Sequence, residues 1–204
     1  MIPAAVAPRP PAPAKLKILE VADRLFYTEG IHTVGVDRII NEAHVTKATF
    51  YKHYRSKDLL IVAYVEGRHY RAKNLVDEAR ANLTDPASVL RALAALIGQI
   101  AVRTGFHGCP FINAAAQFSD VDHPVRQAVA RHRAWERSVV AELVTELGHP
   151  APEDAIDDLI LFRDGALSGS NVGDPERAYR ALARAVERII AERSAGSGTH
   201  LRTA

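Results

Sequence analysis

The strongest fold signal in this chain is the segment from Val36 to Lys57, which reads VDRIINEAHVTKATFYKHYRSK. Its apolar residues have the spacing of two short helices that share one small core across a tight turn. Thr46 is a residue type that caps helices, so the second helix is expected to begin there. From His44 to Lys57 there are four cations and no acid. This composition suits a helix in a DNA groove, because cations bind phosphates and hydroxyl groups reach base edges.

Helical periodicity and helix-ending residues recur along the chain and predict an all-α fold of about nine helices. The first helix is expected to bury one face made of Leu16, Leu19, Ala22, Leu25 and Phe26. No alternation of apolar and polar residues persists long enough to predict a strand. A further helix start is expected near Pro110, and the other helices are expected at residues 15–30, 36–43, 46–53, 56–83, 86–102, 124–148, 152–167 and 175–192.

Charge and cysteine content narrow the class of protein. Residues 1–60 carry nine Lys and Arg against six Asp and Glu, whereas residues 61–204 carry seventeen against eighteen. The positive charge is therefore concentrated around the segment suited to DNA. A single cysteine, Cys109, excludes an intrachain disulfide and suits a reducing compartment. Without a long apolar run to span a membrane, the chain is expected to be cytoplasmic.

The composition divides the chain into four predicted parts. Residues 1–14 are rich in Pro and Ala and are expected to form a disordered arm, and residues 194–204 a flexible tail. Between them, residues 15–60 are expected to form a helix-turn-helix DNA-binding domain and residues 61–193 a second helical domain. One hypothesis has Arg9, Lys15 and Lys17 contact the DNA backbone or minor groove.

Over about residues 15–65 the chain resembles the tetracycline-repressor (TetR) family of bacterial transcriptional regulators. The motifs that carry the resemblance are A-x-x-L-F-x-x-x-G, V-x-x-I-x-x-x-A-x-V, T-K-A-T-F-Y-K-H-Y and S-K-D-L-L. Further along, GCPFINAAAQFSDVDHP is similar to a segment in one subset of that family's regulatory domains.

The resemblance implies a homodimer that binds a near-palindromic double-stranded DNA operator, with a recognition helix in each of two major grooves roughly 34–36 Å apart. Two residues depart from the family pattern: Gly35 replaces a capping Thr or Ser, and His44 occupies a turn position that often carries Gly. A left-handed backbone at His44 would be strained. The implied DNA contacts are Gly35, through its backbone N–H, Thr46, Lys47, Thr49, Tyr51, His53 and Lys57.

The resemblance also implies that residues 61–193 bind a small-molecule effector and form the dimer. The predicted helices at residues 152–167 and 175–192 have broad apolar faces. Either a self-complementary dimer interface or the core of a single chain would explain these faces. The implied dimer contacts are Ile156, Leu159, Ile160, Phe162, Leu167, Leu182, Val186 and Ile189. A largely apolar effector pocket is expected to involve Phe106, His107, Cys109, Phe111, Asn113, Gln117, Phe118, His132 and Trp135.

The residues raise four other interpretations. Cys109 precedes Pro110 near a helix start, where a thiol can become reactive, so a repressor that senses oxidants or electrophiles is an alternative to a buried, inert cysteine. His107, Cys109 and His123 lack the usual spacing of metal ligands, so no metal and no cofactor are expected. Common catalytic motifs are absent, so an enzyme is not expected. A helical small-molecule-binding module without DNA binding is the remaining alternative. We predict a ligand-responsive repressor that its effector releases from DNA.

Overall fold

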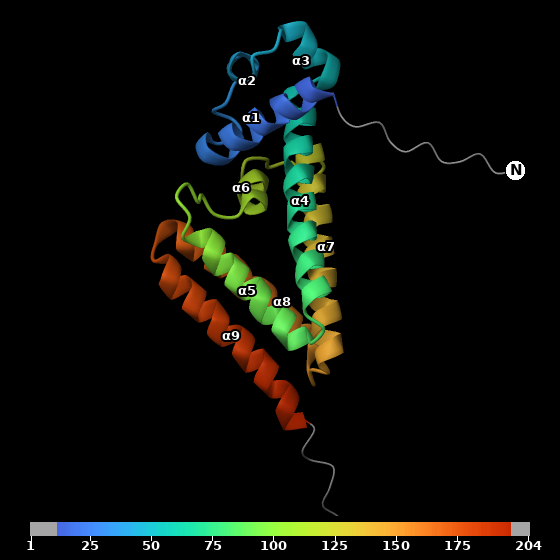
Figure 1. Cartoon of the computed structure of the whole chain (residues 1–204), viewed down its shortest axis with the longest axis vertical. Helices are drawn as coiled ribbons and strands as arrows, with labels where there is room; N and C mark the ends of the chain where they lie inside the picture. Colours follow the sequence, from blue (N-terminus) through green and yellow to red (C-terminus); the bar gives the residue numbers. More distant parts are fainter. Residues whose placement is uncertain (1–11, 197–204) are drawn as a thin grey trace, which may run out of the picture. The chain divides into compact units, whose positions relative to one another are not determined.

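The computed structural model describes residues 12–196, and nine α-helices and no strand occur in this part of the chain (Figure 1). The all-α prediction is therefore confirmed. The expected arm falls largely on residues 1–11, and the expected tail largely on residues 197–204, which lie outside the described residues. The helices are α1 (Pro13–Glu29), α2 (Val36–Ala43), α3 (Lys47–His53), α4 (Lys57–Asn82), α5 (Pro86–Ala101), α6 (Pro110–Ala116), α7 (Pro124–Leu147), α8 (Pro152–Val172) and α9 (Pro175–Gly196).

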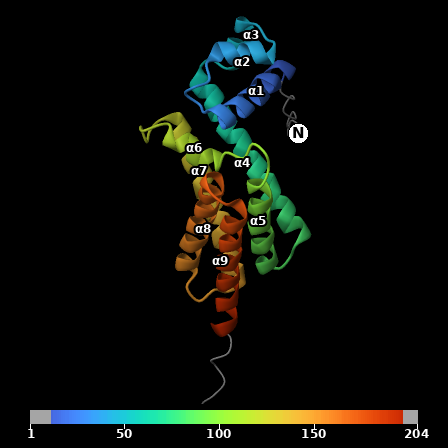
Figure 2. The same cartoon turned by 90° about the vertical axis from the view of Figure 1, so that its left-hand side faces the viewer.

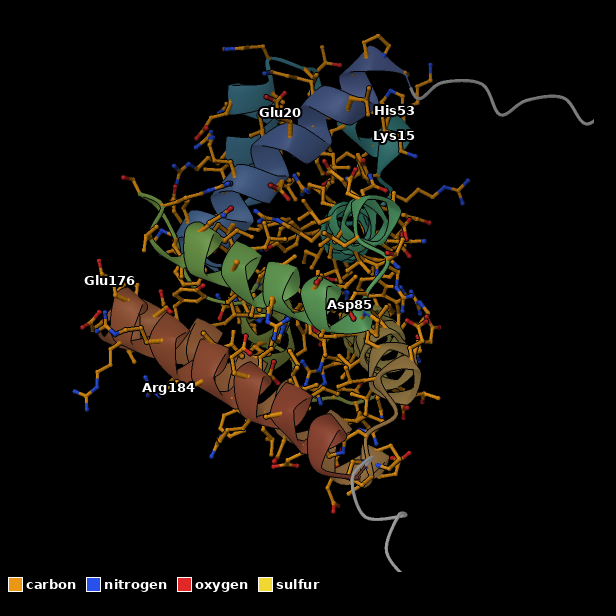
Figure 3. The ribbon with its side chains drawn as sticks, turned by 60° about the horizontal axis from the view of Figure 1, so that its bottom comes forward. Lys15, Glu20, His53, Asp85, Glu176 and Arg184 are labelled. Carbon is orange, nitrogen blue, oxygen red and sulfur yellow. The ribbon has the colours of Figure 1, made fainter. Side chains whose placement is uncertain are left out.

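Side-chain caps and prolines set several helix starts where the sequence places them. Thr46 accepts a hydrogen bond from the Thr49 N–H at 3.1 Å, and Asp85 does the same for Ser88 at 3.0 Å. Figure 3 shows Asp85 at the beginning of α5. Each cap satisfies a backbone donor that has no partner inside the helix. The helix α8 extends to Val172, five residues past its predicted end at residue 167.

The chain divides into two compact units, Met1–Tyr64 and Val65–Ala204, and the division falls inside α4. In the first unit, α1, α2, α3 and the beginning of α4 enclose a small core. The prediction that Leu16 belongs to it is wrong, because Leu16 is 51% exposed. At about 100° per residue, Leu16 lies on the opposite side of α1 from Leu25. The largest fully buried side chains of this core are Ile18, Leu25, Ile31, Ile39, Phe50, Leu60 and Ile61.

The second unit has a larger core between α5, α7, α8 and α9, and Figure 2 shows α8 and α9 side by side. Six of the eight side chains expected at the dimer contact are buried within the chain and are 2–7% exposed, and five of the six lie in this core. A side chain buried within its own chain has little surface left for a partner, so this burial favours the alternative of a single-chain core, and the dimer contact stays a prediction. Ile160 and Phe162 pack against the same core and are half-buried. The six are Ile156, Leu159, Leu167, Leu182, Val186 and Ile189.

Candidate DNA-binding surface and effector pocket

A tight turn joins α2 to α3 in the first unit. His44 ends α2 with φ 53° and ψ 44°, and it is the one non-glycine residue with positive φ among residues 12–196. His44 therefore adopts the left-handed conformation that is strained for a residue with a side chain. Backbone N–H groups of His44 and Val45 donate to the carbonyls of Asn41 and Ile40, each at 3.2 Å. These bonds hold the crossing of the two helices while Val45 is only half-buried.

The outer face of α3 is polar and aromatic. Phe50 points into the core, and its ring meets Tyr51 edge-on with centroids 5.2 Å apart. Thr46, Lys47 and Tyr51 are exposed, as expected for a surface that contacts DNA. Thr49, His53 and Lys57 are half-buried, and partial burial lowers the pKa of Lys57, which Asp58 opposes.

Charge is unevenly neutralised across the helix-turn-helix. Arg24 and Arg38 both bind Glu42, and Arg38 also binds Glu29 through Nη2 and Oε1 at 2.8 Å, so this network ties α1 to α2. The hydrogen bonds from the two arginines lower the pKa of Glu42. Away from that network, Lys47 lies 3.5 Å from Asp37.

Two of the four cations between His44 and Lys57 were not among the DNA contacts named from the sequence. Lys52 and Arg55 are exposed and form no ion pair with any residue that the structure describes. The sequence feature that could have identified them is the run of four cations without an acid from His44 to Lys57. Together with Lys47 they give this end of the unit a positive surface that can bind phosphates.

An open pocket of about 570 Å³ lies in the second unit, between α6, the loop that follows it, α7 and α8. Most of its lining is apolar, as in small-molecule sites. Of the nine side chains expected to contact a ligand, Phe111 alone lines it. The lining residues are Phe111, Ile112, Ala115, Ala116, Val121, Arg126, Val129, Ala130, Arg133 and Asp164.

Beside the pocket, Phe111 belongs to a buried cluster centred on His132. The rings of Phe111 and His132 stack with centroids 3.3 Å apart, and Trp135 lies 5.4 Å from His132. His132 is 2% exposed, and among the side chains of residues 12–192 its Nε2 is the one buried polar atom without a hydrogen-bond partner. Burial, helped by nearby Arg163, lowers the pKa of His132 to about 3. His132 is therefore neutral at physiological pH.

Four charged side chains form a network at the edge of the pocket. Arg133 donates to Glu136 at 2.7 Å and to Asp164 at 2.6 Å, and Arg163 binds Glu136 and Asp164, each at 2.7 Å. Burial raises the pKa of Glu136, and the two guanidinium groups oppose that shift. The network contains two cations and two anions and is internally compensated. It reaches Cys109, whose Sγ lies 3.6 Å from Nη1 of Arg163.

The other side chains expected at a ligand site have local structural roles. Asn113 donates to the carbonyl of His107 at 2.6 Å, and Gln117 to the carbonyl of Asn113 at 3.2 Å. Phe118 stacks on His123 with centroids 4.4 Å apart. Phe106 is half-buried and does not line the pocket. These contacts hold α6 and its flanking loops in place.

Two classes of feature are absent from the part of the chain that the structure describes. No group of three or more His, Cys, Asp or Glu side chains could hold a metal ion there. None of its helices is both long and apolar enough to span a bilayer.

Comparison with known proteins identifies the family. The model for bacterial regulatory proteins of the tetR family matches residues 18–64, which contain α2 and α3. The HTH-type transcriptional regulator LmrA of Bacillus subtilis is 32% identical over 137 residues, which cover 65% of this chain and 71% of LmrA. The chain belongs to the TetR family of transcriptional regulators.

A solved TetR-family regulator from Streptomyces coelicolor supports this assignment over nearly the whole chain. It is 37% identical and superposes with a TM-score of 0.84, covering 89% of this chain and 96% of the other. The HTH-type transcriptional repressor NemR of Escherichia coli is 26% identical over 131 residues, which cover 62% of this chain and 63% of NemR. The predicted TetR resemblance is confirmed, and the chain is a DNA-binding transcriptional regulator rather than an enzyme.

Proposed function

We propose that this TetR-family regulator is a repressor that binds a near-palindromic operator as a homodimer and leaves it when a small molecule occupies the second unit. The observation that carries the proposal is the exposed face of α3, where Lys47, Tyr51 and Lys52 lie together and no acid shares the helix. The proposed DNA contacts are Gly35, Thr46, Lys47, Thr49, Tyr51, His53 and Lys57.

Residues 61–193 are proposed to form the effector-binding and dimerisation domain. Since the inward faces of α8 and α9 are used within the chain, the dimer contact is assigned to their outward faces. Leu161 is 68% and Val172 83% exposed on α8, and they are large apolar side chains that an interface would cover. Glu176 and Arg184 lie on the outer side of α9 (Figure 3), where opposite charges can pair across a two-fold axis.

The effector is proposed to bind in the 570 Å³ pocket, with Phe111 in contact. Because α4 continues from the first unit into the second, a shift of α4 can transmit occupancy to the DNA-binding helices. An effector empties an operator only if it binds the released state more tightly than the DNA-bound state.

The test is selection of fragmented genomic DNA with the full chain, followed by binding assays on the enriched sequence. We expect one palindromic site to be enriched. Its affinity is expected to fall about 10³–10⁵-fold between 50 and 200 mM salt for six to ten phosphate contacts.

Tyr51→Ala is expected to weaken specific binding by about 1–3 kcal/mol. Tyr70→Ala, which removes another exposed phenol outside the DNA-binding unit, is the matched control and is expected to bind normally. A folded dimer that enriches no site at low salt would contradict the proposal.

A second candidate is repression relieved through the Cys109 thiol. The guanidinium of Arg163 favours it, because it lies 3.6 Å from the sulfur and reactive cysteines lie beside cations. The 2% exposure of Cys109 opposes it, since a reagent must first reach the sulfur. Cys109→Ser is expected to abolish release of DNA by N-ethylmaleimide if this candidate is correct. A variant that still responds to the reagent excludes it.

A further inference from the structure

We propose that the pocket binds a compound with one carboxylate and an apolar body, and that Arg126 binds the carboxylate. This inference rests on the proposed function, because it names the chemical class of the effector. Arg126, on α7, is one of three charged residues that line the pocket, together with Arg133 and Asp164.

The charges of Arg133 and Asp164 are already satisfied. Both carboxylate oxygens of Asp164 accept hydrogen bonds from Arg133, at 2.8 and 2.6 Å, and one also accepts from Arg163 at 2.7 Å. Glu136 forms an ion pair with Arg133 and another with Arg163. A cationic ligand would therefore have to displace an arginine to reach Asp164, so the network does not attract cations.

Arg126 is the pocket charge that remains uncompensated. Its Nη1 donates to the carbonyl of Ala115 at 3.1 Å, which fixes the guanidinium at the pocket wall. Within residues 12–196 no carboxylate lies at ion-pair distance from it. A guanidinium has five N–H donors in a fork that matches a carboxylate, and the bond to the Ala115 carbonyl uses only one of them. Since Arg126 is half-buried, an anion that reaches it gains a strong charge-assisted contact.

The rest of the pocket selects an apolar body. Seven of its ten lining side chains are apolar and come from α6, α7 and the loop between them. A volume of about 570 Å³ lies inside the range of small-molecule sites. A compound with several charges would leave the others without partners against these side chains, which is costly. The combination selects one anionic group at Arg126 and a hydrocarbon or aromatic remainder.

The experiment compares three probes with one skeleton, naphthoate, naphthylmethanol and naphthylmethylammonium, by titration calorimetry on the full-length protein. We expect naphthoate to bind at least about tenfold more tightly than the alcohol, and the ammonium more weakly than either. Arg126→Met is expected to remove the preference by weakening naphthoate about tenfold while leaving the alcohol unchanged. Arg131→Met is the matched control, because Arg131 is exposed on the same helix and pairs with Glu66 instead.

Equal affinity of the wild-type protein for the acid and the alcohol would overturn the inference without any variant, as would a preference for the ammonium or no binding by any probe. Undiminished naphthoate binding by Arg126→Met would also overturn it. DNA binding is measured on the same preparations. A protein that binds its operator but shows no carboxylate preference loses this inference alone, whereas one that prefers the carboxylate but binds no DNA loses the proposed function.

Discussion

The imidazole rings of His69 on α4 and His132 on α7 meet through their Nδ1 atoms, which are 3.2 Å apart. A hydrogen bond between two ring nitrogens needs one donor and one acceptor, so at least one ring must be neutral. His132 is the ring with the strongest reason to be neutral, because its pKa is lowered to about 3 mainly by burial. The packing around His132 therefore depends on an uncharged imidazole.

The second unit should lose stability in mild acid. The pKa of His132 is about 3 in the folded chain and about 6.5 when unfolded. The unfolded chain therefore binds the proton more tightly between these values. The contribution of neutral His132 to the free energy of unfolding is present above about pH 6.5 and is lost as the pH falls towards 3. This loss is about 2 kcal/mol between pH 7.5 and 5. Urea denaturation followed by the fluorescence of Trp135 measures this slope.

Two variants separate His132 from the other titrating groups. His132→Phe keeps an aromatic ring against Phe111 but cannot be protonated, so its stability should fall less between pH 7.5 and 5. His53→Gln removes a histidine from the first unit and should leave the slope in the second unit unchanged. Equal slopes in His132→Phe and the wild-type protein would show that His132 does not set the acid sensitivity.

Close approach of α5 and α9 should make Gly98 intolerant of a side chain. A Cβ at residue 98 would lie 2.6 Å from Cδ2 and 2.7 Å from Cγ of Tyr179, so the ring would have to move. We expect Gly98→Ala to destabilise the protein by about 1–3 kcal/mol from overpacking, less the roughly 0.8–1 kcal/mol that alanine gains in a helix. Gly67→Ala in α4, where a Cβ meets no atom closer than 4.0 Å, should instead be neutral or stabilising. Thermal melts of both variants decide the point.

Local signals in the sequence were sufficient for much of the fold. The bounds of α2 match the prediction, and the starts of α5 and α7 follow Asp85-Pro86 and His123-Pro124, because a cap followed by proline acts within one helical turn. Apolar periodicity also showed that α8 and α9 have buried faces. It did not show what those faces bury against, since the same pattern serves a single-chain core and a dimer contact. Leu159 and Val186 lie in the single-chain core.

The pocket illustrates what the sequence did not supply. Aromatic residues between Phe106 and Phe118 suggested a ligand site, but such residues are equally suited to packing, and most of them pack. Arg126 and Asp164 line one pocket although 38 residues separate them by number in the chain. Only the packing of α7 against α8 brings them together, and no local pattern encodes that contact.

The left-handed turn at His44 should carry a measurable cost. A non-glycine side chain in this conformation is strained by roughly 1 kcal/mol. We expect His44→Gly to be more stable than His44→Ala by about 1 kcal/mol, because glycine relieves the strain and alanine retains it. The comparison of these two variants cancels the loss of the imidazole. Equal unfolding free energies in urea would show that the turn is not strained.

Removing the negative charge of Asp37 should strengthen DNA binding, if the exposed face of α3 contacts DNA as proposed. Asp37 lies 3.5 Å from Lys47, and both side chains are well exposed. The carboxylate repels phosphates and competes with them for the lysine. In Asp37→Asn, Lys47 is free to bind a phosphate, so operator affinity should rise about two- to fivefold at low salt. The plot of log affinity against log salt should steepen by about 0.9 for the added phosphate contact.

Asp77→Asn is the matched control, because it breaks a similar exposed pair with Lys73 on α4, outside the DNA-binding unit. If Asp77→Asn raised the affinity as much as Asp37→Asn, the gain would come from net charge rather than from the α2–α3 surface. An unchanged or weaker affinity in Asp37→Asn would place Lys47 outside the DNA contact.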